Sequence, residues 1–434
     1  MARRRVYADL RVLLNGRDVG ILSREANGAV SFQYATEWLD WTATFPISLS
    51  LPLREERYVG APVLNVFDNL LPDNDQIRRR IAERVGADGA DAYSLLSVLG
   101  RDCVGALQFL AEDAEVGIVG SSDGAPIDDD AIGVLIANLA VSPLGLEADA
   151  DFRISIAGAQ EKTALLRKDG QWFKPTGTAA TTHILKPQIG MLPNGVDLTN
   201  SVENEYLCLK LLAAFGVPAA HADIADFGGR RTLVVERFDR RWGADGRLLR
   251  LPQEDMCQAL SVPPTRKYQT EGGPGLVDIL DLLKGSDQPI ADMTTFMRSA
   301  VIFWLIGATD GHAKNFSIFL GPGGRFRLTP LYDVLSAQPS VDDHQIRKNA
   351  FKLAMSVGQN RHYAVDEIAP RHFQQTAERA GLGLSIVNAI FEDLAANATG
   401  IAERVARDLP ATFPEVLVVS LLSGISRRAL RLTG

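Results

Sequence analysis

Cysteine is scarce in this 434-residue sequence, which has only Cys103, Cys208 and Cys257, far apart along the chain. Their number is odd, and none of them has the short spacing to another that metal-binding cysteines show. The six histidines are scattered as well. The sequence therefore predicts neither a zinc site nor a disulfide framework, and the expected location is a reducing cytoplasm.

Long apolar runs are also missing, and the amino terminus carries no secretion signal. Three arginines follow Met1-Ala2, but no apolar segment comes before Asp9. No run approaches the roughly 20 residues of a membrane-spanning helix. The net charge of −8 argues against nucleic-acid binding by the chain alone, although it leaves room for a local basic face. We expect a soluble protein with no membrane partner.

The composition that is present is ordinary for a globular protein, with 46% hydrophobic and 23% charged residues. The length suggests two or three domains. Alternating segments and glycine turns fill the first half, and helical periodicity dominates from Gln253 onward. We predict an α+β, two-lobed protein-kinase-like fold. Its parts are a β-rich N-terminal subdomain (1–112), a kinase N-lobe (113–238) and a mainly helical C-lobe (239–434).

Local patterns predict individual elements. Alternating apolar residues predict a β-meander and, later, a strand that enters a small-residue loop: Val6–Leu14, Arg17–Leu22, Val30–Tyr34 and Phe152–Ile156. Helical periodicity and capping signals predict helices: Asp75–Val85, Val202–Phe215, Glu254–Leu260, Leu276–Leu283, Asp292–Ile306, Leu384–Ala396 and Ile401–Asp408. The arginines of the Asp75–Val85 helix are expected on a solvated face. Glu112–Asp130 is expected to be an exposed connection.

The stretch from Phe303 to Ala337 carries the strongest chemical signal. It runs from an apolar helix end through a polar loop into an apolar hairpin. Asp310 and Asn315 have the spacing of a kinase catalytic loop, and Asp333 follows the hairpin, where a second metal-binding Asp belongs. Magnesium prefers the oxygen ligands that such side chains supply. The alternative is a polar turn in which Asp310 caps and Asn315 bonds to the backbone.

Other segments fit a nucleotide site. The loop Ala157–Lys162 lies between strand-like segments, as a phosphate-covering loop does, but it has one glycine and a plain β-turn explains it equally well. Lys186 ends a short strand, and Glu205 on the next helix shares the apolar stripe, so Glu205 is the predicted partner of its ammonium group. A surface lysine is the alternative. The charged segment Glu236–Phe238 leaves an apolar strand, as a hinge between kinase lobes does.

The order of these motifs resembles the HipA family, the serine/threonine protein kinase toxins of bacterial toxin–antitoxin pairs. The resemblance is carried by eight stretches in family order: FDNLLPD (67–73), GRDCVGAL (100–107), DFRISIAGAQEKTALL (151–166), TTHILK (181–186), VERFDRRW (235–242), RLPQEDMCQ (250–258), WLIGATDGHAKNFSIF (304–319) and LTPLYDVLSA (328–337). Together they cover nearly the whole chain. The resemblance implies a kinase that uses ATP and Mg2+, with an added β-rich N-terminal subdomain.

The resemblance also implies roles for matching residues. Asp310 would be catalytic, and Asn315 and Asp333 would hold Mg2+. The nucleotide would be bound by Ala157, Gly158, Ala159, Gln160, Glu161, Lys162, Lys186, Glu236, Arg237, Phe238, His312, Lys314, Asn315, Tyr332 and Asp333. Ser155 would be the autophosphorylated serine, since a phosphate dianion beside the triphosphate would repel nucleotide and inactivate the kinase.

The family's partners follow from the same resemblance. Its target class is glutamyl-tRNA synthetase, whose inactivation halts translation and leads to growth arrest and persistence. Its antitoxin is a HipB-like helix-turn-helix dimer that binds operator DNA, so that the pair represses its own promoter. The C-terminal arginines of this chain are interleaved with acidic residues, so we expect operator contact through the antitoxin.

Three other functions stay open from the residues. One is a kinase of the same fold that acts on a lipid or a small molecule, although no membrane-binding segment supports it. Another is a non-catalytic corepressor or scaffold. The third is a metal hydrolase that uses Asp310, His312 and Asp333, but it lacks a second His or Cys at ligand spacing.

Overall fold

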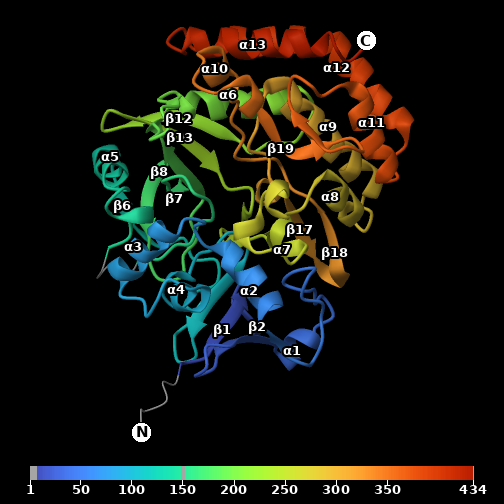
Figure 1. The fold of residues 1–434 in the computed structure, drawn as a ribbon. Helices are drawn as coiled ribbons and strands as arrows, with labels where there is room; N and C mark the ends of the chain where they lie inside the picture. The colour runs from blue at the N-terminus through green and yellow to red at the C-terminus, as the bar shows by residue number, and fades with distance from the viewer. Residues whose placement is uncertain (1–6, 148–151, 434) are drawn as a thin grey trace. The chain divides into compact units, whose positions relative to one another are not determined.

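The computed structural model describes residues 7–147 and 152–433. It comprises two compact units, each assembled from three stretches of chain. Figure 1 shows the helices and strands of the chain. The stretches of the first unit are Met1–Pro187, Ala225–Thr265 and Ile318–Arg325. Those of the second unit are Gln188–Ile224, Arg266–Ser317 and Phe326–Gly434. The predicted domain boundaries after residues 112 and 238 stay predictions.

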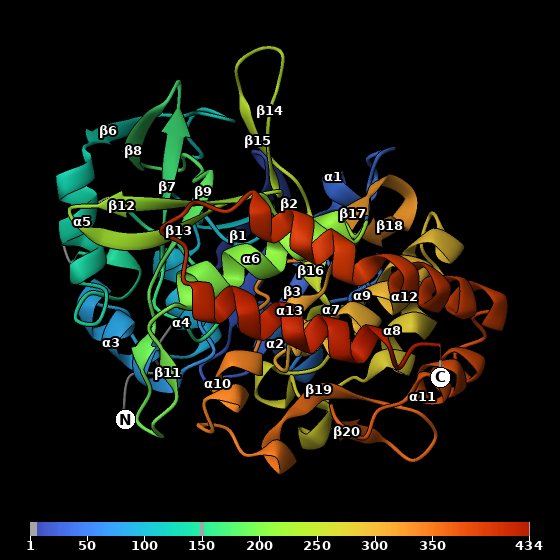
Figure 2. The same ribbon diagram turned by 90° about the horizontal axis from the view of Figure 1, so that it is seen from above.

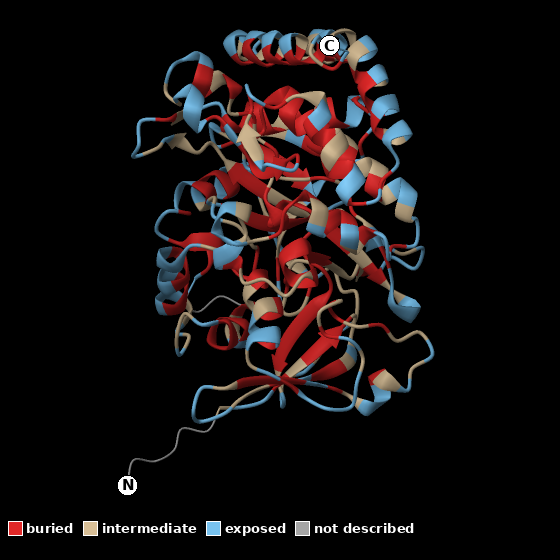
Figure 3. Ribbon diagram, turned by 45° about the vertical axis from the view of Figure 1, so that its right-hand side comes forward, coloured by how far each residue is buried: buried red, intermediate tan, exposed pale blue. Residues whose placement is uncertain are grey.

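A five-stranded antiparallel sheet of order β4-β3-β2-β1-β5 opens the first unit. Its strands are β1 Leu10–Leu14, β2 Arg17–Arg24, β3 Val30–Tyr34, β4 Tyr58–Val59 and β5 Leu107–Ala111, and most of their residues are buried (Figure 3). The predicted meander is confirmed over β1–β3; Val6 lies outside the described residues. Asn15 and Gly16 make its first turn because both take the positive φ that a tight hairpin needs. The unit's first helices are α1 Thr36–Leu39, α2 Ala61–Phe67, α3 Asp75–Val85 and α4 Ala92–Leu99.

A six-stranded sheet of order β12-β13-β9-β7-β8-β6 follows. Its strands are β6 Gly124–Ile127, β7 Thr163–Lys168, β8 Gln171–Pro175, β9 His183–Pro187, β12 Ala222–Phe227 and β13 Arg230–Glu236. Helix α5, Asp129–Ala137, buries Ile132 and Ile136 in the cluster that contains Leu165 and Leu185. Strand β6 corrects the expectation that Glu112–Asp130 is only a connection, because its backbone pairs with β8.

One predicted element of the first unit was wrong, and another is shorter than predicted. Phe152–Ile156 forms no strand, because the Ser155 amide donates to the Asp102 carbonyl, in a loop, rather than to a neighbouring strand. The predicted helix Glu254–Leu260 shortens to α7, Met256–Ala259, after strand β16, Gln253–Asp255. The other small elements of the first unit are β14 Arg240–Trp242 and β15 Leu248–Arg250. Strands β17 Ser317–Gly321 and β18 Arg325–Leu328 each contain residues of both units.

The second unit is mainly helical. Its helices are α6 Ser201–Ala214, α8 Leu276–Leu283, α9 Pro289–Ile306, α10 Gln338–Asp342, α11 Pro370–Arg379, α12 Leu384–Arg407 and α13 Glu415–Ala429. Its short hairpins are β10 Gly190–Met191 with β11 Asp197–Leu198, and β19 Lys352–Val357 with β20 His362–Ala364. From buried Arg428 on α13, the guanidinium donates to the Leu305 carbonyl and to Gln338. Helix α13 is thereby fixed to the start of the predicted catalytic stretch and to the residue that follows its end.

Helix α12 is continuous, although the sequence predicted a break after Ala396. Gly400 costs about 1 kcal/mol relative to alanine inside a helix. Ala398 and Ala402 on either side are buried, so tertiary packing overrides that local preference. Helix α13 runs beside α12, with Thr399 donating to Ser426 at 3.3 Å (Figure 2).

Helix α9 corrects the expectation that no apolar run has membrane-spanning length. Its 18 residues are long and apolar enough by length and composition, with a mean hydropathy of 1.2. However, 67% of the helix is buried inside the protein, including Phe296, Val301 and Trp304. The apolar residues therefore form the core of the second unit.

Candidate active site

The loop after α9 in the second unit forms a tight turn. Gly307 ends the helix with φ 69° and ψ 36°, the left-handed conformation that favours glycine, and an added Cβ would lie 2.7 Å from the Phe351 ring. The His312 amide donates to the Asp310 carbonyl at 2.8 Å, and the Asn315 amide donates to the His312 carbonyl at 2.9 Å. The second of these bonds closes a 3-10 turn over Ala313–Asn315. Backbone hydrogen bonds thus fix the conformation of the loop that carries Asp310 and Asn315.

Asn315 and Asp333 come together in this unit. The Asn315 side-chain nitrogen donates to the Asp333 carbonyl at 3.0 Å, so the amide oxygen is the Asn315 atom suited to a Mg2+ ion. Asp333 has φ 60°, a left-handed backbone that is uncommon for non-glycine residues and recurs at functional sites. The chemistry of this pair fits Mg2+.

The metal-hydrolase alternative gains no support. Across residues 7–147 and 152–433, no group of three or more His, Cys, Asp or Glu side chains is placed to hold a metal ion. Asp310, His312 and Asp333 therefore do not form such a cluster.

Asp310 is exposed, and its carboxylate accepts a hydrogen bond that the sequence did not predict. The Tyr268 hydroxyl donates to Asp310 Oδ1 at 2.6 Å. The Tyr268 ring also meets the His312 ring edge-on, with centroids 4.8 Å apart. Tyr268 lies in no motif and 42 positions before Asp310, so no sequence pattern linked the two residues.

Lys314 and Tyr332, both predicted to bind nucleotide, are joined to each other. The Tyr332 hydroxyl donates to the Lys314 carbonyl at 2.8 Å and lies 2.5 Å from the Ser317 hydroxyl. These bonds tie the end of the Ala313–Asn315 turn to the residue before Asp333. Lys314 and His312 are both buried.

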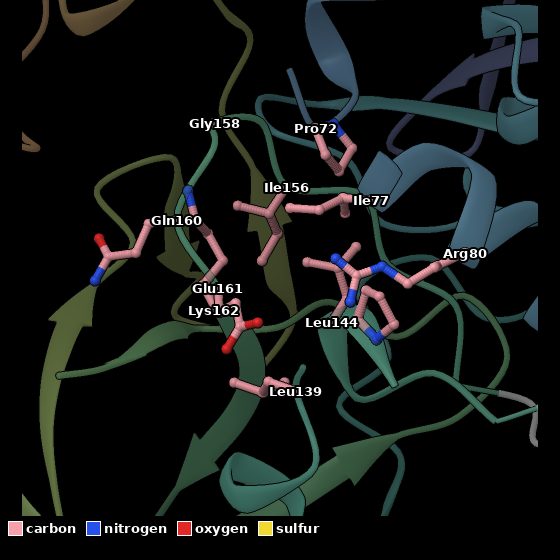
Figure 4. Close-up of a pocket in the computed structure, with 11 residues that line it drawn as sticks. Pro72, Ile77, Arg80, Leu139, Leu144, Ile156, Gly158, Gln160, Glu161 and Lys162 are labelled. Atoms are coloured by element: carbon pink, nitrogen blue, oxygen red, sulfur yellow. The ribbon is translucent and has the colours of Figure 1, made fainter. Parts of the chain in front are cut away.

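In the first unit, the predicted phosphate loop is held at several points (Figure 4). Gly158 forms a parallel bridge with Pro72. The Lys162 ammonium donates to the Ala157 carbonyl at 2.9 Å, and the Gln160 side chain donates to the Pro187 carbonyl at 3.2 Å. Gly158 has φ 108°, and an added Cβ would lie 2.4 Å from the Lys162 nitrogen. Only glycine fits, so this single glycine has a structural reason.

A small pocket lies against this loop, lined by Ile77 and Arg80 of α3 on one side and by Gly158 and Lys162 on the other (Figure 4). Arg80 donates to the Ala140 carbonyl. The expectation of a solvated arginine face holds for Arg79, Arg80 and Arg84, which are exposed, and is wrong for Arg78. Arg78 is buried and forms an ion pair with Asp68 at 2.5 Å, and Arg84 donates to the Leu146 carbonyl at 3.4 Å.

Ser155 is fully buried just before the loop. Its hydroxyl donates to the Leu70 carbonyl at 2.8 Å, and its amide donates to the Asp102 carbonyl at 2.9 Å. A phosphate group does not fit a fully buried hydroxyl of this kind, so phosphorylation requires this segment to leave its place.

The other predicted residues of the nucleotide site lie on β9, α6 and the end of β13. Lys186 is buried on β9 opposite Leu233, and Glu205 on α6 is buried as its apolar stripe predicted. Their pairing stays a prediction. Glu236 is exposed at the end of β13, and the Phe238 ring packs edge-on against Phe319 at 5.8 Å.

Arg237 belongs to a buried charge network instead of an open site. Its guanidinium donates to Asp239 at 2.8 Å and to Asp102 at 3.3 Å, and its amide donates to the Thr182 carbonyl. Arg240 and Arg250 also donate to Asp102. Burial alone raises the pKa of Asp102, but the three arginines hold that pKa far below its ordinary value. The Arg237 side chain is thus engaged in the network.

Comparison with known families adds to this geometry. The HipA-like C-terminal domain matches residues 154–403, and the HipA N-terminal domain matches residues 10–110. The chain belongs to the HipA family. The family resemblance inferred from eight motifs is confirmed, and the matched ranges include all the predicted site residues.

Individual HipA-family relatives match along almost the whole chain. A putative kinase Y4mE of Sinorhizobium fredii is 37% identical over 93% of this chain and 92% of its own length. The serine/threonine-protein kinase toxin HipA of Shewanella oneidensis is 28% identical over 92% of this chain and 87% of its own length. Relatives of this chain are therefore named as kinases.

A solved HipA-family structure shares the fold. The Shewanella oneidensis HipA in a complex with HipB and operator DNA aligns with a TM-score of 0.81, covers 97% of each chain and is 24% identical. The predicted α+β class, with a sheet-rich N-terminal region and a helical C-terminal region, is confirmed.

Proposed function

We propose that this HipA-family protein is an ATP- and Mg2+-dependent serine/threonine protein kinase. The observation that carries the proposal is the turn in which Asp310, Asn315 and Asp333 are tied together by backbone bonds and by the Asn315–Asp333 bond. Kinase chemistry is mostly positioning and charge neutralisation, so a few fixed oxygen groups suffice. Relatives named as kinases support the same activity.

In the proposed reaction, the acceptor hydroxyl oxygen forms a bond to the γ-phosphorus as the bond to the ADP oxygen breaks. The exposed Asp310 carboxylate receives the hydroxyl proton. Asn315 and Asp333 would hold Mg2+, which would supply neutralisation of the charge on the phosphates. Lys186, His312, Lys314, Tyr332 and the Ala157–Lys162 loop bind the nucleotide, and Glu236 and Phe238 contact its base.

The decisive experiment is intact mass before and after incubation with ATP and Mg2+, with the modified peptide mapped. We expect wild type to gain one phosphate on Ser155 and the Asp310→Asn variant to gain none while keeping its fold. Phosphate transfer by the Asp310→Asn variant would contradict the assigned mechanism. Nucleotide binding without transfer by wild type would favour the corepressor instead. Starting material should first be treated with a phosphatase, since a phosphate already on Ser155 would mask the gain.

We further propose that phosphorylation of Ser155 switches the kinase off. The serine is buried and bonded to Leu70 and Asp102, so a phosphate on it must displace the segment that leads into the phosphate loop. Proteolysis of residues 152–162 should be faster in the phosphorylated protein. Equal protection of both forms would contradict this switch.

We propose a HipB-like antitoxin dimer as partner, with operator DNA bound through it, and glutamyl-tRNA synthetase as cytoplasmic substrate. The solved HipA relative in complex with HipB and operator DNA supports the partner. The substrate rests on the family resemblance alone. Adding this chain to the antitoxin should raise operator affinity. Unchanged affinity at every salt concentration would argue against joint repression.

A further inference from the structure

Tyr268 contacts the proposed catalytic carboxylate in the second unit. Its hydroxyl donates to Asp310 Oδ1 at 2.6 Å, within the range of short bonds between a hydroxyl and a carboxylate. A hydrogen bond to one oxygen of a carboxylate restricts rotation about the last side-chain bond of that residue. A donor fixed on Oδ1 therefore sets the orientation of the whole Asp310 carboxylate.

The segment around Tyr268 is itself held in place. The Lys267 carbonyl accepts a bond from the Ala313 amide at 3.4 Å, and the Gln269 side chain accepts one from the Ser356 amide at 2.7 Å. The Tyr268 carbonyl accepts bonds from the Glu271 and Gly273 amides, each at 3.0 Å. Both neighbours of Tyr268 in sequence are therefore anchored, one of them to the catalytic turn.

The Tyr268 ring is fixed as well. It stands edge-on to the buried His312 ring, at 87° between planes, and the Lys267 ammonium lies 5.5 Å from the Tyr268 ring centroid. Such contacts hold an aromatic ring without using its hydroxyl. The hydroxyl is thus presented to Asp310 by a rigid support, as a positioning group requires.

We propose that Tyr268 is a positioning residue that orients the Asp310 carboxylate for proton acceptance; the proposal rests on the kinase function above. Tyr268 acts on the transfer step through Asp310 and has no part in holding Mg2+, which belongs to Asn315 and Asp333.

The test is Tyr268→Phe, which keeps the ring contacts and removes only the hydroxyl. We expect kcat for phosphate transfer to fall about ten- to a hundredfold, the range for a misaligned reacting group, with KM for ATP unchanged. The matched control is Tyr363→Phe. The Tyr363 hydroxyl bonds Gln269 on the same segment at 3.4 Å, not Asp310, so this variant should keep the wild-type kcat.

Three outcomes in the Tyr268→Phe variant would overturn the inference. They are an unchanged kcat in Tyr268→Phe, a loss confined to KM for ATP, and an increase in kcat, which would make the hydroxyl a blocking group that occupies the acceptor's place. A fall of equal size in Tyr363→Phe would also overturn it, since it would show only loosening of the segment. Wild type and Asp310→Asn run alongside, and absence of transfer by wild type would refute the kinase function itself.

Discussion

Two fully buried carboxylates of the first unit have opposite acid–base behaviour. Asp102 lies among three arginines, which outweigh burial and lower its pKa. Glu254 receives the Leu49 amide at 2.8 Å but has no cation among its main influences, so burial raises its pKa to about 8 from 4.5. The surroundings of each side chain, not its type, decide which form is stable at neutral pH.

Glu254 predicts a pH-dependent stability. The pKa of Glu254 is higher in the folded than in the unfolded protein. At a pH between the two values, the native state therefore binds a proton that the unfolded state has released. The stabilisation is fully present below pH 4.5 and is lost as pH rises toward 8. Glu254→Gln, which keeps an acceptor for Leu49, should therefore be more stable than wild type at pH 8, by on the order of a few kcal/mol.

Urea unfolding at pH 5 and pH 8 measures this difference. The control is Glu403→Gln on α12, an exposed position that should leave the pH slope unchanged. If the free energy of unfolding of Glu254→Gln depended on pH as it does in wild type, the Glu254 carboxyl group would not titrate in this range.

At the scale of elements, the Asp102 network joins segments that lie far apart in sequence. Asp102 is in the loop after α4, Arg240 and Arg250 belong to β14 and β15, and Arg250 also donates to the Thr178 carbonyl at 2.9 Å. The Asp102 carbonyl accepts the Ser155 amide. Asp102 thereby joins the arginines through its carboxylate and supports the segment that leads into the phosphate loop through its backbone carbonyl.

Removing that charge should be costly. Asp102→Asn leaves three buried arginines with only Asp239 to balance them, and breaking a buried ion pair on one side costs about 3–5 kcal/mol. Chemical denaturation should show a midpoint shift of corresponding size. Asp245→Asn breaks an exposed pair with Arg247 and should leave the midpoint unchanged. Equal, small effects of both substitutions would show that the network contributes little.

At the scale of the whole molecule, ligand binding can be measured through the stability of the protein, because a ligand that binds only the native state raises the melting temperature. ATP with Mg2+ at 100 times its Kd should stabilise wild type by about 2.7 kcal/mol. In Asn315→Ala and Asp333→Ala the Mg2+-dependent part should vanish, as it should for wild type in EDTA.

Thermal shift measurements with and without Mg2+ check this. Asp310→Asn is the matched control, since Asp310 is proposed to take a proton and not to hold the metal, so its shift should match wild type. Two outcomes would contradict the assigned roles. One is loss of the Mg2+-dependent shift in melting temperature in Asp310→Asn, and the other is an unchanged shift in both alanine variants.

The sequence alone determined the features that depend on residues close to one another along the chain. The meander β1–β3, the helices α6, α8 and α9, and the turn from Asp310 to Asn315 follow from alternation, periodicity and turn residues, which act between near neighbours. The order of the eight motifs identified the family, because motifs and their order can be read from the sequence without knowing which residues are in contact.

Only the tertiary structure decided what depends on distant partners. Gly400 is inside a continuous α12 because burial on either side outweighs its poor helix propensity. The Phe152–Ile156 segment forms no strand because Ser155 bonds to the distant carbonyls of Leu70 and Asp102. Arg237 donates to a buried carboxylate that lies 135 positions away. Tyr268 touches Asp310 across 42 positions. Such pairings have no local signal, because the free energy that selects them appears only when the folded chain brings them together.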